Sequence, residues 1–248
     1  MKLELIDIRK NFGEKQVLKG AGFSFEKGKI YGLLGRNGAG KTTLFNCLSG
    51  EMEMDGGKAL LTGSENGEDT AAKKLMPEQI GYVFSTPILP EFLTGYEFLK
   101  FFIDINKDII RIDKTIDEYF DLIKIEAEDR YRLIKGYSHG MKNKIQMLCF
   151  IISRPPVILL DEPLTSFDVV VALEMKKLLR EIKKDHIIIF STHILELAAD
   201  LCDEIVVLSN GVLELVDHQM LHTKEFEERI IELLSDEKNM EEERVGLK

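Results

Sequence analysis

Several features that mark membrane-spanning, disulfide-bonded or nucleic-acid-binding proteins are missing from this sequence. Its longest apolar run covers residues 147–152, whereas a helix needs about 18 apolar residues to cross a bilayer. The first residues enter an amphipathic pattern and do not resemble a signal peptide. Acidic residues outnumber basic ones by 43 to 33, which argues against a nucleic-acid backbone as the main partner.

Cysteine is also scarce. The three cysteines at positions 47, 149 and 202 are widely separated, so neither a disulfide framework nor a metal cluster is predicted. They are expected to be small apolar residues in a reducing compartment. The composition therefore favours a cytoplasmic protein.

The most informative segment that is present reads Gly-Arg-Asn-Gly-Ala-Gly-Lys-Thr-Thr, at residues 35–43, directly after the apolar residues 30–34. This spacing matches the G-x-x-x-x-G-K-[ST] phosphate loop between a buried strand and a helix. The glycines allow a tight concavity whose N–H groups point at phosphate oxygens. Lys41 would place its charge at the β- and γ-phosphates, and Thr42 would offer a hydroxyl to Mg²⁺. The segment predicts a nucleoside triphosphate site.

Two further strand ends carry polar groups. Asp161 and Glu162 follow the apolar residues 157–160, and ligands in parallel sheets gather at such carboxyl ends. Asp161 can hold Mg²⁺ through water and Glu162 can polarise an attacking water, although an acidic pair there can also be a plain helix cap. His193, after the strand at 187–190, can bond a γ-phosphate or be structural.

The order of predicted elements indicates the fold class. Strands are predicted at 3–8, 16–25, 30–34, 58–62, 80–84, 157–160, 187–190, 205–208 and 212–216, and helices at 96–105, 112–125, 169–183 and 194–202. Another helix should begin after Ser138 and end at Pro155-Pro156. The pattern predicts an α/β P-loop NTPase core with a mostly parallel sheet. An N-terminal antiparallel β region and an inserted helical subdomain at about 87–155 would complete it.

The chain resembles the nucleotide-binding subunit of an ABC transporter over residues 1–220. Besides the phosphate loop and the Walker B strand that ends at Asp161, residues 137–141 (Tyr-Ser-His-Gly-Met) stand at the family signature, 23 residues before Asp161 counted from Ser138. His193 matches the switch histidine, and residues 165–168 match the D-loop. Residues 221–248 would form a C-terminal helix and a charged tail.

The resemblance implies a two-lobed fold and a head-to-tail dimer with a second copy or a paralogous ATPase subunit. ATP would lie between the phosphate loop of one subunit and the signature of the other. Catalysis would use Lys41, Glu162 and His193, and Mg²⁺ would be held by Thr42 and Asp161. The resemblance also implies a set of nucleotide contacts. Phe12 would stack on adenine, and the signature would contribute Ser138, Gly140 and Met141. The contacts from the phosphate loop would be Gly35, Asn37, Gly38, Ala39, Gly40, Lys41, Thr42 and Thr43.

Two positions depart from the family pattern. Ser85 stands where the family has a glutamine that contacts Mg²⁺ and water, and its hydroxyl reaches roughly 2 to 3 Å less far. Either a water bridges that gap or the coupling to Mg²⁺ is weakened. His139 replaces the first signature glycine and adds bulk at the dimer seam, while Gly140 is kept. Met141 is also expected to pack.

The interpretation is an Mg-dependent ATPase that drives a separate membrane permease, contacted through the helical subdomain, at the cytoplasmic face of the membrane. The signature form favours export, and the cargo is not encoded in this chain. An ATP-dependent regulatory clamp with weak hydrolysis is the alternative. A soluble ATPase acting on ribosomes or DNA fits less well, because such proteins usually carry two nucleotide domains or a long coiled coil.

Overall fold

The computed structural model describes residues 1–65, 68–108, 110, 112–163 and 169–216. The D-loop match at 165–168 and the predicted C-terminal helix and tail at 221–248 lie outside these residues. Among the helices that the structure describes, none has the length and apolar character needed to cross a membrane.

A six-stranded sheet forms the centre of the molecule, with strand order β12-β11-β3-β10-β9-β8. All neighbours are parallel except β12, which runs antiparallel to β11 at one edge. Every residue of β3, β9 and β10 is buried, as expected for strands covered on both faces. The mostly parallel sheet is therefore confirmed. The strands are β3 (Ile30–Leu34), β8 (Ile80–Val83), β9 (Val157–Asp161), β10 (Ile187–Thr192), β11 (Glu204–Ser209) and β12 (Val212–Val216).

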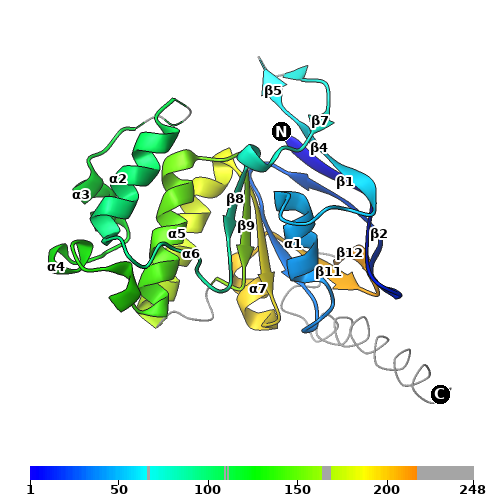
Figure 1. Cartoon of the computed structure of the whole chain (residues 1–248). Coiled ribbons are helices and arrows are strands. Elements are labelled where there is room, and N and C mark those ends of the chain that lie inside the picture. Colours follow the sequence, from blue (N-terminus) through cyan, green and yellow to red (C-terminus); the bar gives the residue numbers. More distant parts are fainter. Residues whose placement is uncertain (66–67, 109, 111, 164–168, 217–248) are drawn as a thin grey trace.

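A second, antiparallel sheet covers one face of the central sheet (Figure 1). Leu3, Leu5 and Phe25 of this sheet share a buried cluster with Val157 and Leu159 of the central sheet, and helix α1 (Lys41–Ser49) contributes to the same cluster. The predicted N-terminal antiparallel region is confirmed. It contains β1 (Lys2–Phe12), β2 (Lys15–Glu26), β4 (Gly56–Thr62) and the short β7 (Lys73–Lys74), and a small hairpin of β5 (Ser64–Glu65) and β6 (Glu68–Asp69) follows β4.

Helices pack on the other face of the central sheet. The buried cluster on this side joins strand residues such as Ile158 and Phe190 to helix residues such as Met175 and Leu201. The central sheet is thus covered on both faces, and because its strands other than β12 run parallel, their carboxyl ends lie at one edge. The elements on this face are α5 (His139–Ser153), α6 (Val169–Ile182), a short 3-10 turn at Lys183–Asp185, and α7 (Leu195–Leu201).

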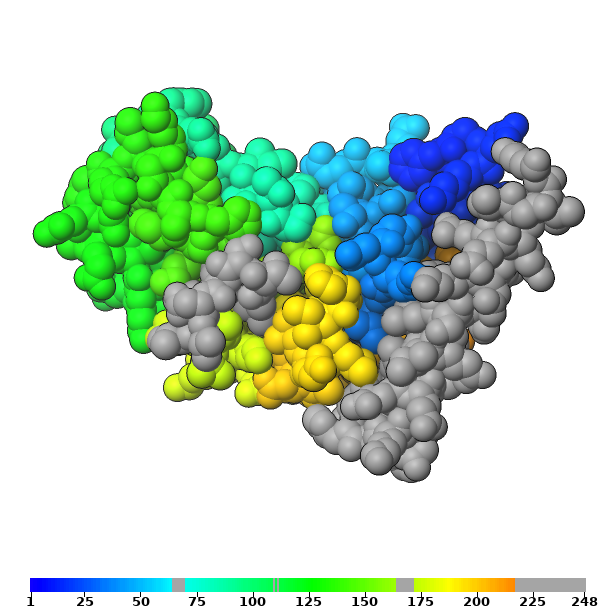
Figure 2. Space-filling view, turned by 90° about the horizontal axis from the view of Figure 1, so that it is seen from below, coloured from blue at the N-terminus to red at the C-terminus, as the bar shows by residue number. Residues whose placement is uncertain are grey.

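The helix-rich stretch lies beside β8 and forms one end of the molecule, opposite the N-terminal strands (Figures 1 and 2). Helix α5 belongs to two cores, because Met147 packs with the central sheet while Ile145 and Leu148 pack with the other helices. The other helices of this stretch are α2 (Gly95–Asn106), α3 (Ile116–Leu122) and α4 (Ala127–Arg130), with a 3-10 turn at Ile134–Gly136, while another 3-10 turn at Pro77–Gln79 precedes β8.

The prediction of a helix over 112–125 was too long. Thr115 caps α3, because its side chain accepts from Glu118 N and Glu118 bonds back to Thr115 N. This capping box fixes the first helical residue at Ile116. The apolar spacing that suggested an earlier start came from Ile112, which precedes the cap and is exposed.

Candidate nucleotide-binding site

The candidate site forms where the carboxyl ends of four neighbouring parallel strands meet. The register pairs Leu34 of β3 with Thr192 of β10, and Asp161 of β9 with Ser191. Val83 of β8 pairs with Leu160, one residue before Asp161. The segments that follow these strands therefore share one edge of the sheet, where open α/β sheets bind their ligands.

The phosphate loop joins β3 to α1. Gly38 and Gly40 have φ angles of 87° and 107°, a region that glycine enters without steric cost. Gly40 is the N-cap of α1 in this left-handed conformation. Gly35 is needed for another reason: a Cβ there would lie 2.9 Å from the carbonyl oxygen of Leu208. Ala39 closes the turn by donating its N–H to Arg36 O at 3.1 Å.

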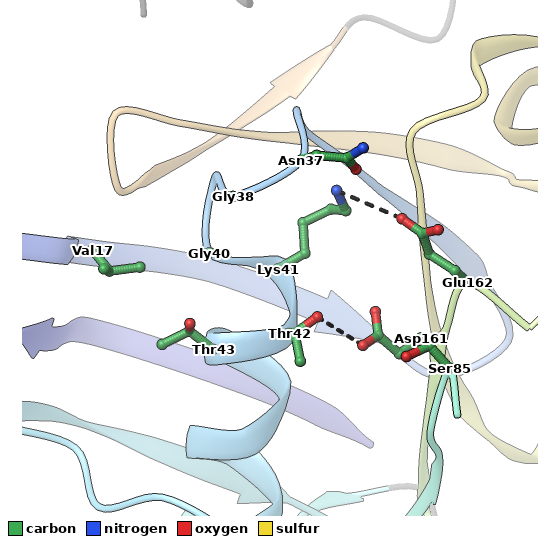
Figure 3. A pocket seen from close by; sticks show the side chains of 10 residues that line it. All are labelled: Val17, Asn37, Gly38, Gly40, Lys41, Thr42, Thr43, Ser85, Asp161 and Glu162. Carbon is green, nitrogen blue, oxygen red and sulfur yellow. Dashed lines mark hydrogen bonds and ion pairs between the residues drawn. The ribbon is translucent and has the colours of Figure 1, made fainter. Parts of the chain in front are cut away.

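Lys41 is the basic group of the site. Its side chain is only 6% exposed, and Nζ donates to Gly35 O at 2.7 Å and to Arg36 O at 3.2 Å. Nζ also lies 4.0 Å from Glu162 Oε1 (Figure 3). The ammonium is therefore held beside the loop and faces the carboxylate that follows β9.

The Thr42 hydroxyl and the Asp161 carboxylate lie on the other side of the loop. Thr42 Oγ1 donates to Asp161 Oδ2 at 2.8 Å (Figure 3), and Ser191 Oγ donates to Asp161 Oδ1 at 2.5 Å. The Asp161 residue is 2% exposed. A hydroxyl and a carboxylate are the ligands that Mg²⁺ prefers, so the donor set fits the predicted metal.

Glu162 has an unusual backbone. Its φ is 48°, a left-handed conformation that is uncommon for a residue with a side chain. Two bonds from its N–H hold it there, to Ser191 Oγ at 3.1 Å and to Ser191 O at 3.2 Å. This turn aims the carboxylate away from Asp161 and toward Lys41 (Figure 3).

His193 contacts Glu162 directly, with 3.0 Å between Nδ1 and Oε1. Because an ionised carboxylate only accepts hydrogen bonds, Nδ1 is the donor in this contact. The predicted switch histidine thus lies next to the predicted base.

Lys41, Thr42, Asp161 and Glu162 line a cavity of about 340 Å³, whereas His193 does not line it. The sequence predicted every lining residue except one: Val17, from β2, lies across the loop from the carboxylates (Figure 3). The lining residues are Val17, Asn37, Gly38, Gly40, Lys41, Thr42, Thr43, Ser85, Asp161 and Glu162.

Six predicted nucleotide contacts do not line this cavity: Phe12, Gly35, Ala39, Ser138, Gly140 and Met141. Phe12 ends β1 with 48% of its surface exposed, and Lys10 Nζ lies 5.8 Å from its ring centroid. Ser138 is the N-cap of α5 and accepts from Met141 N at 3.2 Å. Gly140 lies in the first turn of that helix.

Ser191 and Val17 are the site residues that sequence reasoning missed. Ser191 is fully buried and bonds both carboxylate residues. Its position as the first polar residue after the apolar strand 187–190 was an available signal. Val17 gave no local signal, because only the packing of the two sheets brings β2 near Gly40, where a Cβ would lie 2.8 Å from Val17 Cγ1.

We expect Ser191→Ala to lower the free energy of unfolding by about 1 to 3 kcal/mol, because two buried bonds lose their partner. Urea unfolding followed by circular dichroism would measure this. Ser49→Ala is the matched control, since Ser49 Oγ makes only a local bond to Asn46 O at 3.2 Å. Equal losses in the two variants would contradict the role given to Ser191.

A glycine-rich loop entering a helix beside two carboxylates at the edge of a parallel sheet defines a P-loop nucleotide-binding domain. The family model described as ABC transporter matches residues 18–165, more than half of the chain. The chain therefore belongs to the ABC transporter family.

Relatives of this chain include ATP-binding proteins. It is 30% identical over 214 residues to the uncharacterized ABC transporter ATP-binding protein YdbJ of Bacillus subtilis, covering 86% of this chain and 68% of that protein. It is 29% identical over 222 residues to the sulfate/thiosulfate import ATP-binding protein CysA of Pectobacterium atrosepticum, covering 86% and 66%. The chain thus spans about two thirds of each relative.

A solved structure, described as an ATP binding subunit of an ABC transporter, shares the fold. Its TM-score is 0.76 at 27% identity, and the alignment covers 94% of this chain and 99% of that one. The expected fold class and family are both confirmed. The family's nucleotide, ATP, matches the ligand class that the loop predicts.

Proposed function

We propose that this chain is the ATP-hydrolysing subunit of an ABC transporter, that it dimerises around ATP, and that it drives a separate membrane permease. The observation that carries the proposal is the convergence of Lys41, Thr42, Asp161 and Glu162 on one cavity. A phosphate loop alone serves many activities. The second carboxylate, turned away from the metal position, supports hydrolysis by an activated water.

Each side chain has a proposed role. The loop N–H groups and Lys41 would bind the phosphates, with Asn37 and Thr43 beside them, and Phe12 would stack on adenine. Thr42 and Asp161 would hold Mg²⁺, which when bound neutralises phosphate charge. Glu162 would accept a proton from the attacking water. His193 would orient the Glu162 carboxylate and respond to the γ-phosphate.

The start of α5 supports the proposed dimer. Ser138 and His139 are exposed, and this 15-residue helix presents its N-terminal N–H groups there. Such a terminus attracts phosphate, yet it does not line the cavity of its own chain. A second copy or a paralogous subunit, placed head to tail, would bring Ser138, Gly140 and Met141 to this nucleotide.

A steady-state assay of phosphate release from purified protein tests the proposal. Turnover should require ATP and magnesium and should disappear with EDTA, because the divalent cation that Thr42 and Asp161 would hold supplies the positive charge that neutralises the transferring phosphoryl group. Turnover that is unchanged without a divalent cation would contradict the Mg-dependent mechanism. The proposed direction of transport, export, needs its own test, because one relative, CysA, is named for import. Transport measured in vesicles that hold the co-purified permease would provide it.

A regulatory clamp with weak hydrolysis is the second candidate, and Ser85 favours it. Ser85 lines the cavity beyond the end of β8, but its short side chain reaches less far than a glutamine. We expect Ser85→Gln to raise kcat by about three- to tenfold, because an amide can orient the attacking water. Ser85→Ala is the control and should not accelerate turnover. A fall in kcat with glutamine would contradict this role.

The permease contact is assigned to the helical subdomain, which we place at about 87–155 within a nucleotide-binding domain of residues 1–220. Phe92 and Ile88 are 78% and 73% exposed, and the rings of Tyr96 and Tyr131 stack at 5.2 Å. Exposed apolar groups concentrated in this way mark interaction sites. The chain would then be peripheral, at the cytoplasmic face of the membrane.

Replacing Phe92 and Tyr96 by alanine should reduce co-purification with the permease and abolish substrate-stimulated ATP turnover, because the apolar contact is lost. Basal turnover should stay within about twofold, since neither side chain lines the cavity. Phe101→Ala is the matched control: this residue is 55% exposed but lies five positions along α2 from Tyr96, on another face. Substrate-stimulated ATP turnover that is unchanged in the double variant would contradict the assignment of the permease contact to this surface.

A further inference from the structure

Helix α5 carries a chain of buried amides that leads from its exposed start to the rim of the nucleotide cavity. Gln146 Nε2 donates to Phe84 O at 3.4 Å and to Asn143 Oδ1 at 3.2 Å. Asn143 Nδ2 lies 3.4 Å from His139 Nδ1. Asn143 and Gln146 are only 1% and 8% exposed. Their spacing of i, i+4 and i+7 places all three side chains on one face of the helix.

The donors and acceptors along this row of linked side chains can be arranged in only one way. Because Phe84 O is an acceptor, Gln146 must present its NH₂ group, which then also donates to Asn143 Oδ1. Asn143 Nδ2 is left as a donor, and His139 Nδ1 must accept. Reversing any one amide would break its neighbours' bonds, so the four groups form one linked network.

The end of β8 is also held from the opposite side. Tyr82 Oη donates to Asn46 Oδ1 at 3.1 Å, and Asn46 belongs to α1, the helix that follows the phosphate loop. Burial raises the pKa of Tyr82, so the hydroxyl stays a neutral donor. The rings of Tyr82 and Phe84 lie 4.1 Å apart. The strand that leads to Ser85 is thus fixed between α1 and α5 (Figure 1).

We propose that Gln146 is a positioning residue for ATP hydrolysis. It sets the backbone at Phe84 and Ser85, at the rim of the cavity. Through Asn143 it also links this backbone to His139 at the first turn of α5. A displacement at Ser85 is therefore transmitted along one face of α5 to the surface that would meet the second subunit. The inference rests on the proposed function, because the start of α5 takes part in catalysis only within the dimer.

Gln146→Met tests this role, because methionine keeps the length and volume of the side chain but removes its hydrogen bonds. We expect kcat to fall about three- to tenfold, since small misplacements near the reacting groups are costly. The KM for ATP should stay within about twofold, because the phosphate loop is untouched. Gln79→Met is the matched control at the other end of β8, where Gln79 Oε1 accepts only from the exposed Met76 N.

Asn143→Ala interrupts the same chain and serves as the second variant. It should lower kcat like Gln146→Met, and the double variant should be no slower than the slower single variant, because both break one linked unit. Three results would overturn the inference. The kcat losses of the two single variants could multiply in the double variant, or Gln79→Met could lose as much kcat as Gln146→Met. A rise in KM without a fall in kcat would also contradict it. Thermal unfolding of each variant shows that it is folded before the comparison.

The two levels of failure are distinguishable. Wild-type protein that neither hydrolyses ATP nor dimerises with it would contradict the proposed function, and the role of Gln146 with it. Wild-type protein that does both, while Gln146→Met and Asn143→Ala keep full kcat, would overturn the positioning role alone.

Discussion

Replacing Glu162 by glutamine is expected to slow ATP hydrolysis by at least about a hundredfold while ATP stays bound, because the general base is lost and the binding groups are not. The substitution leaves the backbone contacts of position 162 in place, since it is the main-chain N–H of this residue that donates to Ser191 Oγ and O. The amide oxygen can still accept from His193. Phosphate release under saturating ATP would measure the loss.

The same variant should collect as an ATP-bound dimer, because binding brings the subunits together and hydrolysis is what separates them. Size-exclusion chromatography with light scattering, with and without ATP, would show the shift in mass. Glu196→Gln is the matched control, an exposed carboxylate three residues after His193. Hydrolysis at the wild-type rate in Glu162→Gln would mean that the base is assigned to the wrong residue.

Replacing Lys41 by alanine is expected to weaken ATP binding by about a hundredfold, equivalent to ~2.8 kcal/mol. The reason is the loss of a buried cation beside the phosphates. Lys41 Nζ also ties the loop together through Gly35 O, at 2.7 Å, so the variant loses both charge and preorganisation. Titration with a fluorescent ATP analogue would measure the affinity.

Lys41→Arg separates charge from shape. A planar guanidinium keeps the charge but is bulkier than an ammonium, and Lys41 occupies a site with only 6% of its side chain exposed. Arginine should therefore restore little of the affinity, while Lys58→Ala, on the exposed face of β4, should cost nothing. Affinity within about threefold of wild type in Lys41→Ala would contradict the assigned phosphate contact.

Sequence patterns predicted the long elements well and the short ones poorly. The strand at 30–34 has the predicted bounds, and α5 begins after Ser138 as its cap indicated. Strands β5, β6 and β7 and helix α4 were not predicted, because two to four residues are too few to show a period. Helix α3 was overextended because apolar spacing continues past its cap at Thr115.

The phosphate loop, which is the contiguous part of the site, could be predicted from the sequence. A phosphate loop is contiguous, and its glycines, lysine and threonine act through backbone conformations that a few neighbouring residues determine. The ligand class therefore followed from residues 35–43 alone. The carboxylates after β9 were found for a similar reason, since apolar strands that end in polar residues mark the sheet edge.

Tertiary structure decided which atoms meet. Thr42 and Asp161 are 119 residues apart and bond only because β3 and β9 flank β10 in parallel register. The same register makes Ser191 the partner of both carboxylate residues. Gln146 reached Phe84 O only through the packing of α5 on β8. A sequence encodes conformation through near neighbours, whereas contacts between distant residues depend on sheet order and register, and these emerge only when the whole core packs.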